Sequence, residues 1–221
     1  MDKNRQAITL MQERKYEEAA KIFNEIIEEN PDEPIGYINF GNLLLELNET
    51  ERAERFFLKA IQLDENAATA YFGLGNLYFE INDDFQKAQE YFQKALELGL
   101  EEADVYYMLG LSMQNLEQFK LALPYLLRAT ELDPDEVSYL FQYGLSLAQS
   151  NVIGDAKDVF EKVVAMDEEH SDAYYNLGVI AIYQDDPQQA ISHFNQALQL
   201  HPEHYLAANG KEQVEKFLEE N

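Results

Sequence analysis

The residues best suited to chemistry in this chain are 42 acidic side chains and four histidines, His170, His193, His201 and His204. His201 and His204 flank Pro202-Glu203, and two imidazoles at that spacing are able to bind a metal ion. A zinc site needs three or four converging ligands, and no second pair of ligands stands nearby in the sequence. We therefore expect solvated histidines in turns and no metal site.

Motifs for catalysis are also missing from the sequence. It contains no cysteine, no Ser-His-Asp order, no glycine-rich phosphate loop and no His-Glu-x-x-His string. Carboxylates such as Glu17 and Glu90 stand four residues before Lys21 and Lys94, which is the spacing of ordinary ion pairs on a helix surface. We expect a protein that is not an enzyme and binds no cofactor.

The charge balance limits the classes of partner. The 221 residues include 16 Lys and Arg against 42 Asp and Glu, a formal net charge of −26. Proteins that bind nucleic acid directly need a basic stripe against the phosphates, so that class is not expected. No apolar run approaches the ~18–20 residues of a membrane span. Residues 1–30 are too charged for a secretory signal, and we expect a cytoplasmic protein.

A repeat organises nearly the whole chain. Five glycines recur at intervals of 34, 35, 34 and 34 residues: Gly41, Gly75, Gly110, Gly144 and Gly178. Twelve or thirteen residues after each glycine stands an alanine: Ala53, Ala88, Ala122, Ala156 and Ala190. Four residues later comes a large apolar residue: Phe57, Phe92, Leu126, Phe160 and Phe194. Self-similarity at this period indicates a helical repeat architecture.

Each repeat predicts two helices. In residues 68–102 the first helix has an apolar stripe at positions i, i+3, i+4 and i+7, formed by Tyr71, Leu74, Gly75 and Tyr78. Asn82-Asp83-Asp84 then interrupts the stripe with residues that favour turns and helix N-caps. The second helix is expected from Phe85 to Leu98. The small Gly75 and Ala88 let the two helices approach, and Phe92 fills the remaining space.

This pattern resembles the tetratricopeptide repeat, whose 34-residue helix–turn–helix unit has the same small and large positions. The resemblance implies an all-α fold, a right-handed superhelical solenoid of antiparallel helix pairs. We expect repeats at 34–67, 68–102, 103–136, 137–170 and 171–204. A degenerate repeat at 1–33 precedes them, and a capping helix at 205–221 completes one continuous solenoid domain.

Three features depart from the pattern. The repeat 68–102 has one extra residue in its turn, at Asp83 or Asp84. Pro124 lies inside a second helix, where it forfeits a backbone hydrogen bond and predicts a local bend. Gly210 is expected to weaken the capping helix by ~1 kcal/mol relative to alanine.

The first helices and their turns carry almost no charge. The segments 34–48, 68–82, 103–117, 137–151 and 171–184 contain no Lys or Arg. Their acidic residues are Glu46, Glu80, Asp104, Glu117 and Asp172, so that their net charge is −5. The second helices and the loops must therefore form the charged, solvated surface.

The first helices instead have a second apolar stripe, about a third of a turn from the packing stripe. A surface helix usually needs one such stripe, and the resemblance implies that the second lines a concave groove. Exposed apolar patches mark partner sites. The candidate peptide-binding residues are Ile38, Asn42, Leu45, Phe72, Asn76, Phe79, Tyr107, Leu111, Gln114, Phe141, Leu145, Tyr175, Val179 and Ile182.

Two interpretations of this stripe remain open. Neighbouring first helices touch one another in a solenoid, so the stripe can also pack repeat against repeat. Binding is favoured by the equivalent Asn42 and Asn76, whose amides can both donate to and accept from a peptide backbone. Binding is also favoured by four aromatic residues at one equivalent position, Phe72, Tyr107, Phe141 and Tyr175.

The resemblance also argues against one type of ligand. Members that bind chaperone tails hold a C-terminal carboxylate with Lys, Arg and Asn in the groove. The corresponding residues here are Ile38, Asn42, Gly73 or Phe72, Asp104 and Met108. Because the asparagine alone matches, a chaperone-tail clamp is not expected, and the surrounding negative field disfavours an acidic ligand.

The sequence therefore predicts a non-enzymatic scaffold or adaptor. It would bind a neutral or basic peptide segment or helix, with apolar anchors, in an aromatic concave groove. One alternative is a structural assembly or self-associating subunit that uses the same surface. Another is an acidic surface that steers a basic protein partner, a role that high salt would weaken.

Overall fold

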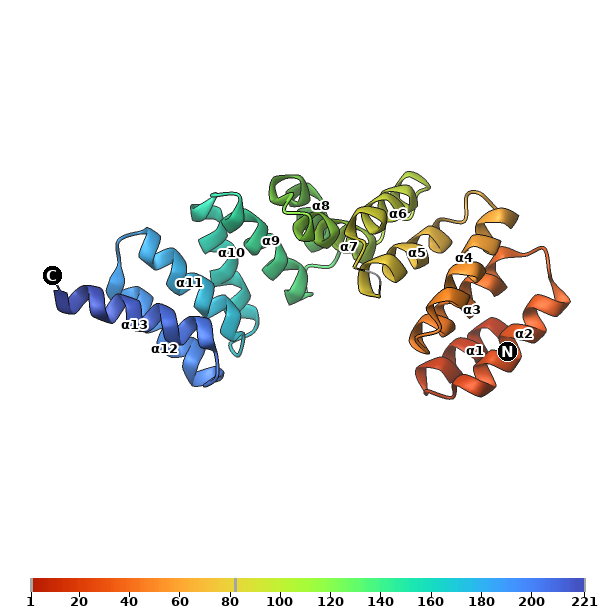
Figure 1. The fold of residues 1–221 in the computed structure, drawn as a ribbon, viewed down its shortest axis with the longest axis horizontal. Coiled ribbons are helices and arrows are strands. Elements are labelled where there is room, and N and C mark those ends of the chain that lie inside the picture. Colours follow the sequence, from red (N-terminus) through yellow and green to blue (C-terminus); the bar gives the residue numbers. More distant parts are fainter. Residues whose placement is uncertain (1, 82, 221) are drawn as a thin grey trace. The chain divides into compact units, whose positions relative to one another are not determined.

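The chain forms thirteen α-helices and no strand over residues 2–81 and 83–220, the part that the computed structural model describes (Figure 1). The helices are α1 Lys3–Gln12, α2 Tyr16–Glu29, α3 Pro34–Glu46, α4 Thr50–Leu63, α5 Ala68–Glu80, α6 Phe85–Glu97, α7 Ala103–Asn115, α8 Phe119–Leu132, α9 Val137–Gln149, α10 Ile153–Met166, α11 Ser171–Tyr183, α12 Pro187–Leu200 and α13 Tyr205–Glu220. None of these described helices has both the length and the apolarity needed to cross a membrane.

The helices divide into two compact units, Met1–Glu117 with α1–α7 and Gln118–Asn221 with α8–α13. Within the first unit, α1 pairs with α2, α3 with α4 and α5 with α6, and each second helix also packs on the next first helix. Within the second unit, α9 pairs with α10 and α11 with α12, while α8 packs on α9 and α13 packs on α12 and α11. Contacts between sequence neighbours dominate, as in repeat proteins.

A buried phenylalanine lies on the second helix of every pair named above: Phe23, Phe57, Phe92, Phe160 and Phe194. Phe57 is 0% exposed and lies against Gly41 of its own pair and Gly73 of the next. An added Cβ would approach the Phe57 ring to 2.7 Å at Gly41 and to 2.4 Å at Gly73. Only a residue without a side chain allows this approach.

Phe194 repeats this arrangement in the second unit. It is 0% exposed, and a Cβ added at Gly178 or Gly210 would lie 2.5 or 2.9 Å from its ring. Gly210 lies within α13, where its cost in helix propensity was expected from sequence. The structure adds a reason for its presence, because a larger residue there would collide with Phe194.

The turn between the two helices of each repeat uses one left-handed residue. Positive φ angles of 50–64° recur with the period of the sequence, at Arg14, Asn48, Asp83, Glu117, Asn151 and Asp185. In residues 68–102 the next residue, Asp84, caps α6 by accepting a hydrogen bond from the N–H of Lys87 at 3.1 Å. The extra residue of this repeat therefore precedes Asp83, and is not Asp83 or Asp84; Asn82 lies outside the described residues.

Changing Glu117 to asparagine should stabilise the protein. Glu117 has φ +58°, and asparagine adopts this region several-fold more readily than most residues. We expect a gain of about 0.5–1 kcal/mol in the free energy of unfolding, measured by urea denaturation. Glu117→Gln is the matched control, because it removes the same charge but glutamine does not favour a positive φ angle. Equal gains in stability for both variants would contradict the explanation from backbone conformation.

Two second helices contain a proline. The helix α8 continues through the exposed Pro124, and the bend expected there stays a prediction. Pro187 occupies the first turn of α12, where Asp186 accepts a hydrogen bond from the N–H of Gln189 at 3.0 Å. This is the position at which the missing N–H of proline has no cost.

Candidate functional site

The histidines are mostly packed, not solvated in turns as the sequence analysis expected. His204 is 7% exposed, and its Nδ1 accepts a hydrogen bond from the N–H of Ala207 at the start of α13. His170 is half-buried and caps α11 in the same way. His193 is half-buried inside α12, where burial lowers its pKa. His201 is exposed, as expected.

These caps could not be predicted from the sequence, because histidine is not among the usual N-cap residues and the aromatic rings beside these two histidines belong to other helices. The His170 ring lies 4.4 Å from that of Phe141, and the His204 ring lies 5.2 Å from that of Tyr175. The Nε2 atom of His204 is 3.0 Å from Oδ1 of Asp172. Among the described residues, no three side chains of the metal-ligating types gather at one place.

The candidate peptide-binding residues differ in exposure. Ile38 is 5% exposed and belongs to the core, so it offers a ligand little surface. Ile182 is 45% exposed. The remaining twelve are half-buried, with part of each side chain open to solvent.

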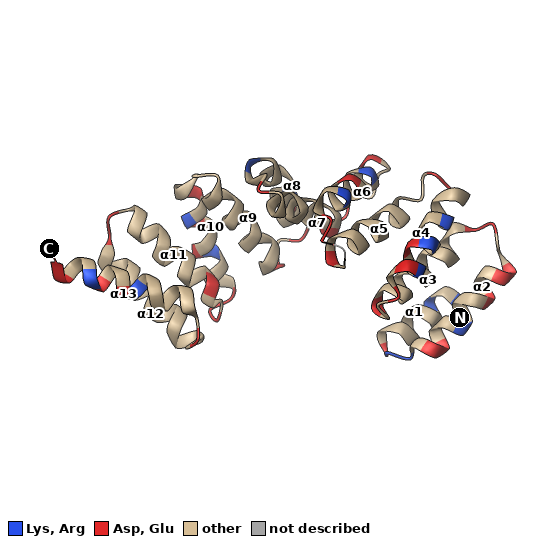
Figure 2. Cartoon of the chain, in the orientation of Figure 1, with Lys and Arg blue, Asp and Glu red and all other residues tan. Residues whose placement is uncertain are grey.

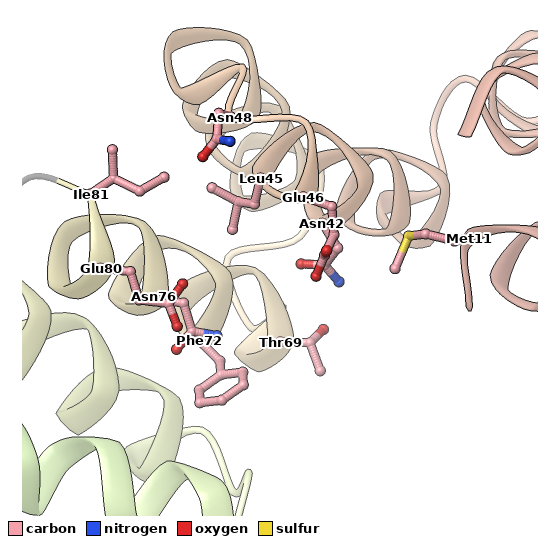
Figure 3. A pocket seen from close by; sticks show the side chains of 10 residues that line it. All are labelled: Met11, Asn42, Leu45, Glu46, Asn48, Thr69, Phe72, Asn76, Glu80 and Ile81. Atoms are coloured by element: carbon pink, nitrogen blue, oxygen red, sulfur yellow. The ribbon is translucent and has the colours of Figure 1, made fainter. Parts of the chain in front are cut away.

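In the first unit, four candidates line one groove with a volume of about 620 Å³. Asn42 and Leu45 come from α3, and Phe72 and Asn76 come from α5 (Figure 3). We call this the first groove, and its residues are Met11, Asn42, Leu45, Glu46, Asn48, Thr69, Phe72, Asn76, Glu80 and Ile81. It combines one aromatic ring and a few aliphatic groups with amides and two carboxylates.

In the second unit, four other candidates line a groove of about 560 Å³. Phe141 and Leu145 come from α9, and Tyr175 and Val179 come from α11. We call this the second groove, and its residues are Phe141, Leu145, Ala148, Gln149, Asn151, Ile153, Asp172, Tyr175, Asn176, Val179, Ile180, Tyr183 and Leu206. Its lining is mainly apolar and aromatic.

The other candidates line neither groove. Phe79 packs its ring edge-on against Phe85, with 5.2 Å between ring centroids. Ile182 lines a smaller cavity of about 340 Å³ with Phe217 of α13. Tyr107, Leu111 and Gln114 lie half-buried on α7.

The groove aromatics also touch the core. The ring of Phe72 lies 5.6 Å from that of the buried Phe92, and the ring of Phe141 lies 5.7 Å from that of Phe160. The ring of Tyr175 lies 6.0 Å from that of the buried Phe194. Each ring therefore has one side on the core of its repeat and another side exposed, so that packing and binding are not exclusive roles for this position.

Glu46 and Glu80 are groove residues that the list of candidates omitted. Each stands four residues, or one helical turn, after the candidates Asn42 and Asn76. Their presence among the few acids of the first helices was visible in the sequence. Their position on the groove was not, because it depends on how α3 and α5 pack.

Neither groove is lined by a Lys or an Arg among its described residues. The first helices α3, α5, α9 and α11 contain no Lys or Arg, whereas the second helices α4, α6 and α10 contain both basic and acidic residues (Figure 2). The first unit as a whole contains 24 acidic and 10 basic side chains, a net charge of −14. The second unit contains 18 acidic and 6 basic side chains, a net charge of −12. Both grooves therefore lie in a negative field, which disfavours acidic ligands.

Comparisons with known proteins agree with the helix pairs. Three tetratricopeptide repeat family models match residues 10–74, 72–137 and 171–204. The crystal structure of YrrB, described as a TPR protein with an unusual peptide-binding site, is 43% identical with a TM-score of 0.83, and the match covers 87% of this chain and 99% of that chain.

Other similarities are shorter or more distant. The TPR repeat-containing protein YrrB of Bacillus subtilis (strain 168) is 56% identical over 39 residues, which covers 18% of this chain and 19% of that protein. A MamA structure is 22% identical with a TM-score of 0.69, covering 73% of this chain and 94% of that chain. PilF of Pseudomonas aeruginosa is 16% identical with a TM-score of 0.81, covering 96% of each chain. These last two share the fold. From the repeats, the helix pairs and these matches, the chain belongs to the tetratricopeptide repeat family.

Proposed function

We propose that this chain is a non-enzymatic interaction scaffold that binds a neutral or basic peptide segment or helix of a partner protein in its two grooves. The observation that supports this most is the lining of the grooves. Each has a partly exposed aromatic ring at the equivalent position of a repeat, Phe72 in one and Phe141 and Tyr175 in the other. Concave sites with aromatic anchors and a few polar groups are typical of ligand binding.

The polar groups of the first groove suit a peptide backbone. Asn42 and Asn76 are half-buried on neighbouring helices of the groove wall, and each amide offers two donors and an acceptor. The likeness to YrrB, a protein described by its peptide-binding site, supports a peptide as the ligand. The family and fold generally serve protein interaction and not catalysis, which supports a scaffold.

A charge placed in either groove tests this function. We expect Leu45→Lys in the first groove and Leu145→Lys in the second to reduce partner capture from the source lysate at least tenfold, about 1.4 kcal/mol of binding free energy. A lysine at either position both occupies part of the groove and repels a basic ligand. Quantitative mass spectrometry of the captured proteins is the measurement.

The matched control is Leu121→Lys, the same change at a residue that is 59% exposed on α8 and lines neither groove. Circular dichroism should show unchanged helix content for all three variants. Capture that is equal for wild type, both groove variants and the control would argue against the grooves as the binding surface.

A second candidate function is self-association, favoured by apolar side chains near the end of the second unit. Tyr183 is 72% exposed and Phe217 is 58% exposed, and such groups often contact another chain. A stable dimer at micromolar concentration in light scattering, lost in Tyr183→Ser/Phe217→Ser, would support this role. Monomers of wild type at that concentration would contradict it.

A further inference from the structure

Two unpaired carboxylates distinguish the first groove. Glu46 on α3 and Glu80 on α5 occupy equivalent positions 34 residues apart and line the groove together with the amides of Asn42 and Asn76 (Figure 3). Both are exposed. Within residues 2–81 and 83–220, neither carboxylate has an ion pair or a hydrogen bond with another side chain.

The second groove has uncharged residues at the same positions. Gln149 on α9 and Tyr183 on α11 are the equivalents of Glu46 and Glu80, and both line the second groove. In the same way, Leu145 and Val179 replace the two asparagines. The first groove therefore has two carboxylates without a side-chain partner. The second groove has one carboxylate, Asp172, whose Oδ1 atom lies 3.0 Å from Nε2 of His204, and its other lining residues are uncharged.

This difference has an electrostatic consequence. Carboxylates on a concave surface without lining cations focus a negative potential into the groove. An ammonium or guanidinium group there can form charge-assisted hydrogen bonds with carboxylate oxygens. The exposed part of the Phe72 ring offers a surface for a guanidinium plane or an aliphatic stem. A carboxylate of a ligand would instead be repelled.

We infer that the first groove selects a lysine or arginine side chain of the bound peptide, which contacts Glu46 and Glu80, whereas the second groove selects an uncharged, apolar side chain. This inference rests on the proposed peptide-binding function and assigns the two grooves different specificities. The two grooves are expected to distinguish basic from uncharged side chains at one position of the repeat. This position is occupied by Glu46 and Glu80 in the first groove and by Gln149 and Tyr183 in the second.

A randomised twelve-residue peptide library, displayed on phage and selected on the full chain, provides the probe. We expect the selected sequences to share a basic residue together with apolar residues. A synthetic peptide of the selected sequence and its variant with norleucine in place of the basic residue are then measured by isothermal titration calorimetry against wild type and Glu46→Gln/Glu80→Gln. These amides keep the size of the side chains and correspond to the natural Gln149.

In wild type, norleucine should weaken binding at least tenfold, and in the double variant the two peptides should bind within about twofold of each other. Such coupling is the evidence for a direct contact. The wild-type preference should also shrink as salt rises. Gln149→Glu is the reciprocal variant and should strengthen binding of peptides with a basic residue added at the apolar anchor.

Failure of this inference is distinguishable from failure of the proposed function. A selected peptide that binds wild type and the Glu46→Gln/Glu80→Gln variant equally, but loses affinity with Leu45→Lys or Leu145→Lys, would overturn the basic subsite and leave peptide binding intact. A selection that enriches no common sequence would overturn both.

Discussion

Replacing Phe194 with alanine is expected to lower the free energy of unfolding by about 3–5 kcal/mol, the usual range for a buried phenylalanine. Phe194 is 0% exposed and sits between Gly178 of α11 and Gly210 of α13. Neither glycine has a side chain that can move into the cavity, so little of the lost contact is recovered. Urea denaturation followed by circular dichroism measures the change.

Phe217→Ala is the control for this prediction, because Phe217 is 58% exposed and surface changes usually alter stability by about 0.5 kcal/mol or less. A second test uses the tight contact itself. Gly178→Ala should destabilise wild type strongly, since its Cβ would lie 2.5 Å from the Phe194 ring. The same change should cost much less in a Phe194→Ala background. Additive effects would show that the contact is not the reason for the glycine.

Replacing Tyr78 with alanine is expected to destabilise the first unit by about 3 kcal/mol or more. Tyr78 is 9% exposed, its ring stacks on Tyr91 at 5.5 Å, and its hydroxyl donates a hydrogen bond to Glu54 of the preceding helix pair at 2.5 Å. The change therefore leaves a cavity and removes a link between repeats. Phe72→Ala, at a half-buried groove position, should cost about 1–2 kcal/mol. An equal loss for both would place Phe72 in the core.

Alkaline pH offers a second readout for Tyr78. The hydrogen bond to Glu54 is the main cause, and burial the second, of a pKa of Tyr78 above its ordinary value of 10.0. The folded state therefore holds this proton more tightly than the unfolded state, and the resulting stability is complete below pH 10. It is lost as the pH rises above 10 toward the folded-state pKa. Tyr78→Phe should show a smaller alkaline loss of stability than wild type, and an unchanged loss would assign the effect to other tyrosines.

The helix pairs could be predicted from the amino-acid pattern alone. A period of 34 residues, with small residues at Gly75 and Ala88 and a large one at Phe92, is sufficient because helix packing requires those sizes at those places. The same repeat indicated the family, and the composition showed that the first helices lack Lys and Arg. The sequence also predicted an N-cap within Asn82-Asp83-Asp84, because capping depends on residues within a few positions along the chain, and the structure shows Asp84 in that role.

Features that depend on contacts between repeats could be seen only in the folded structure. His204 is a buried N-cap whose ring lies against that of Tyr175. Gly210 lies so close to the ring of Phe194 that a larger residue would collide with it. Ile38 lies on the predicted stripe but is covered by its neighbours. Helical periodicity gives the direction in which a side chain leaves its own helix, but burial and groove lining depend on the helices packed beside it. For that reason the carboxylates of Glu46 and Glu80 were visible in the sequence, while their place on the wall of the first groove required the fold.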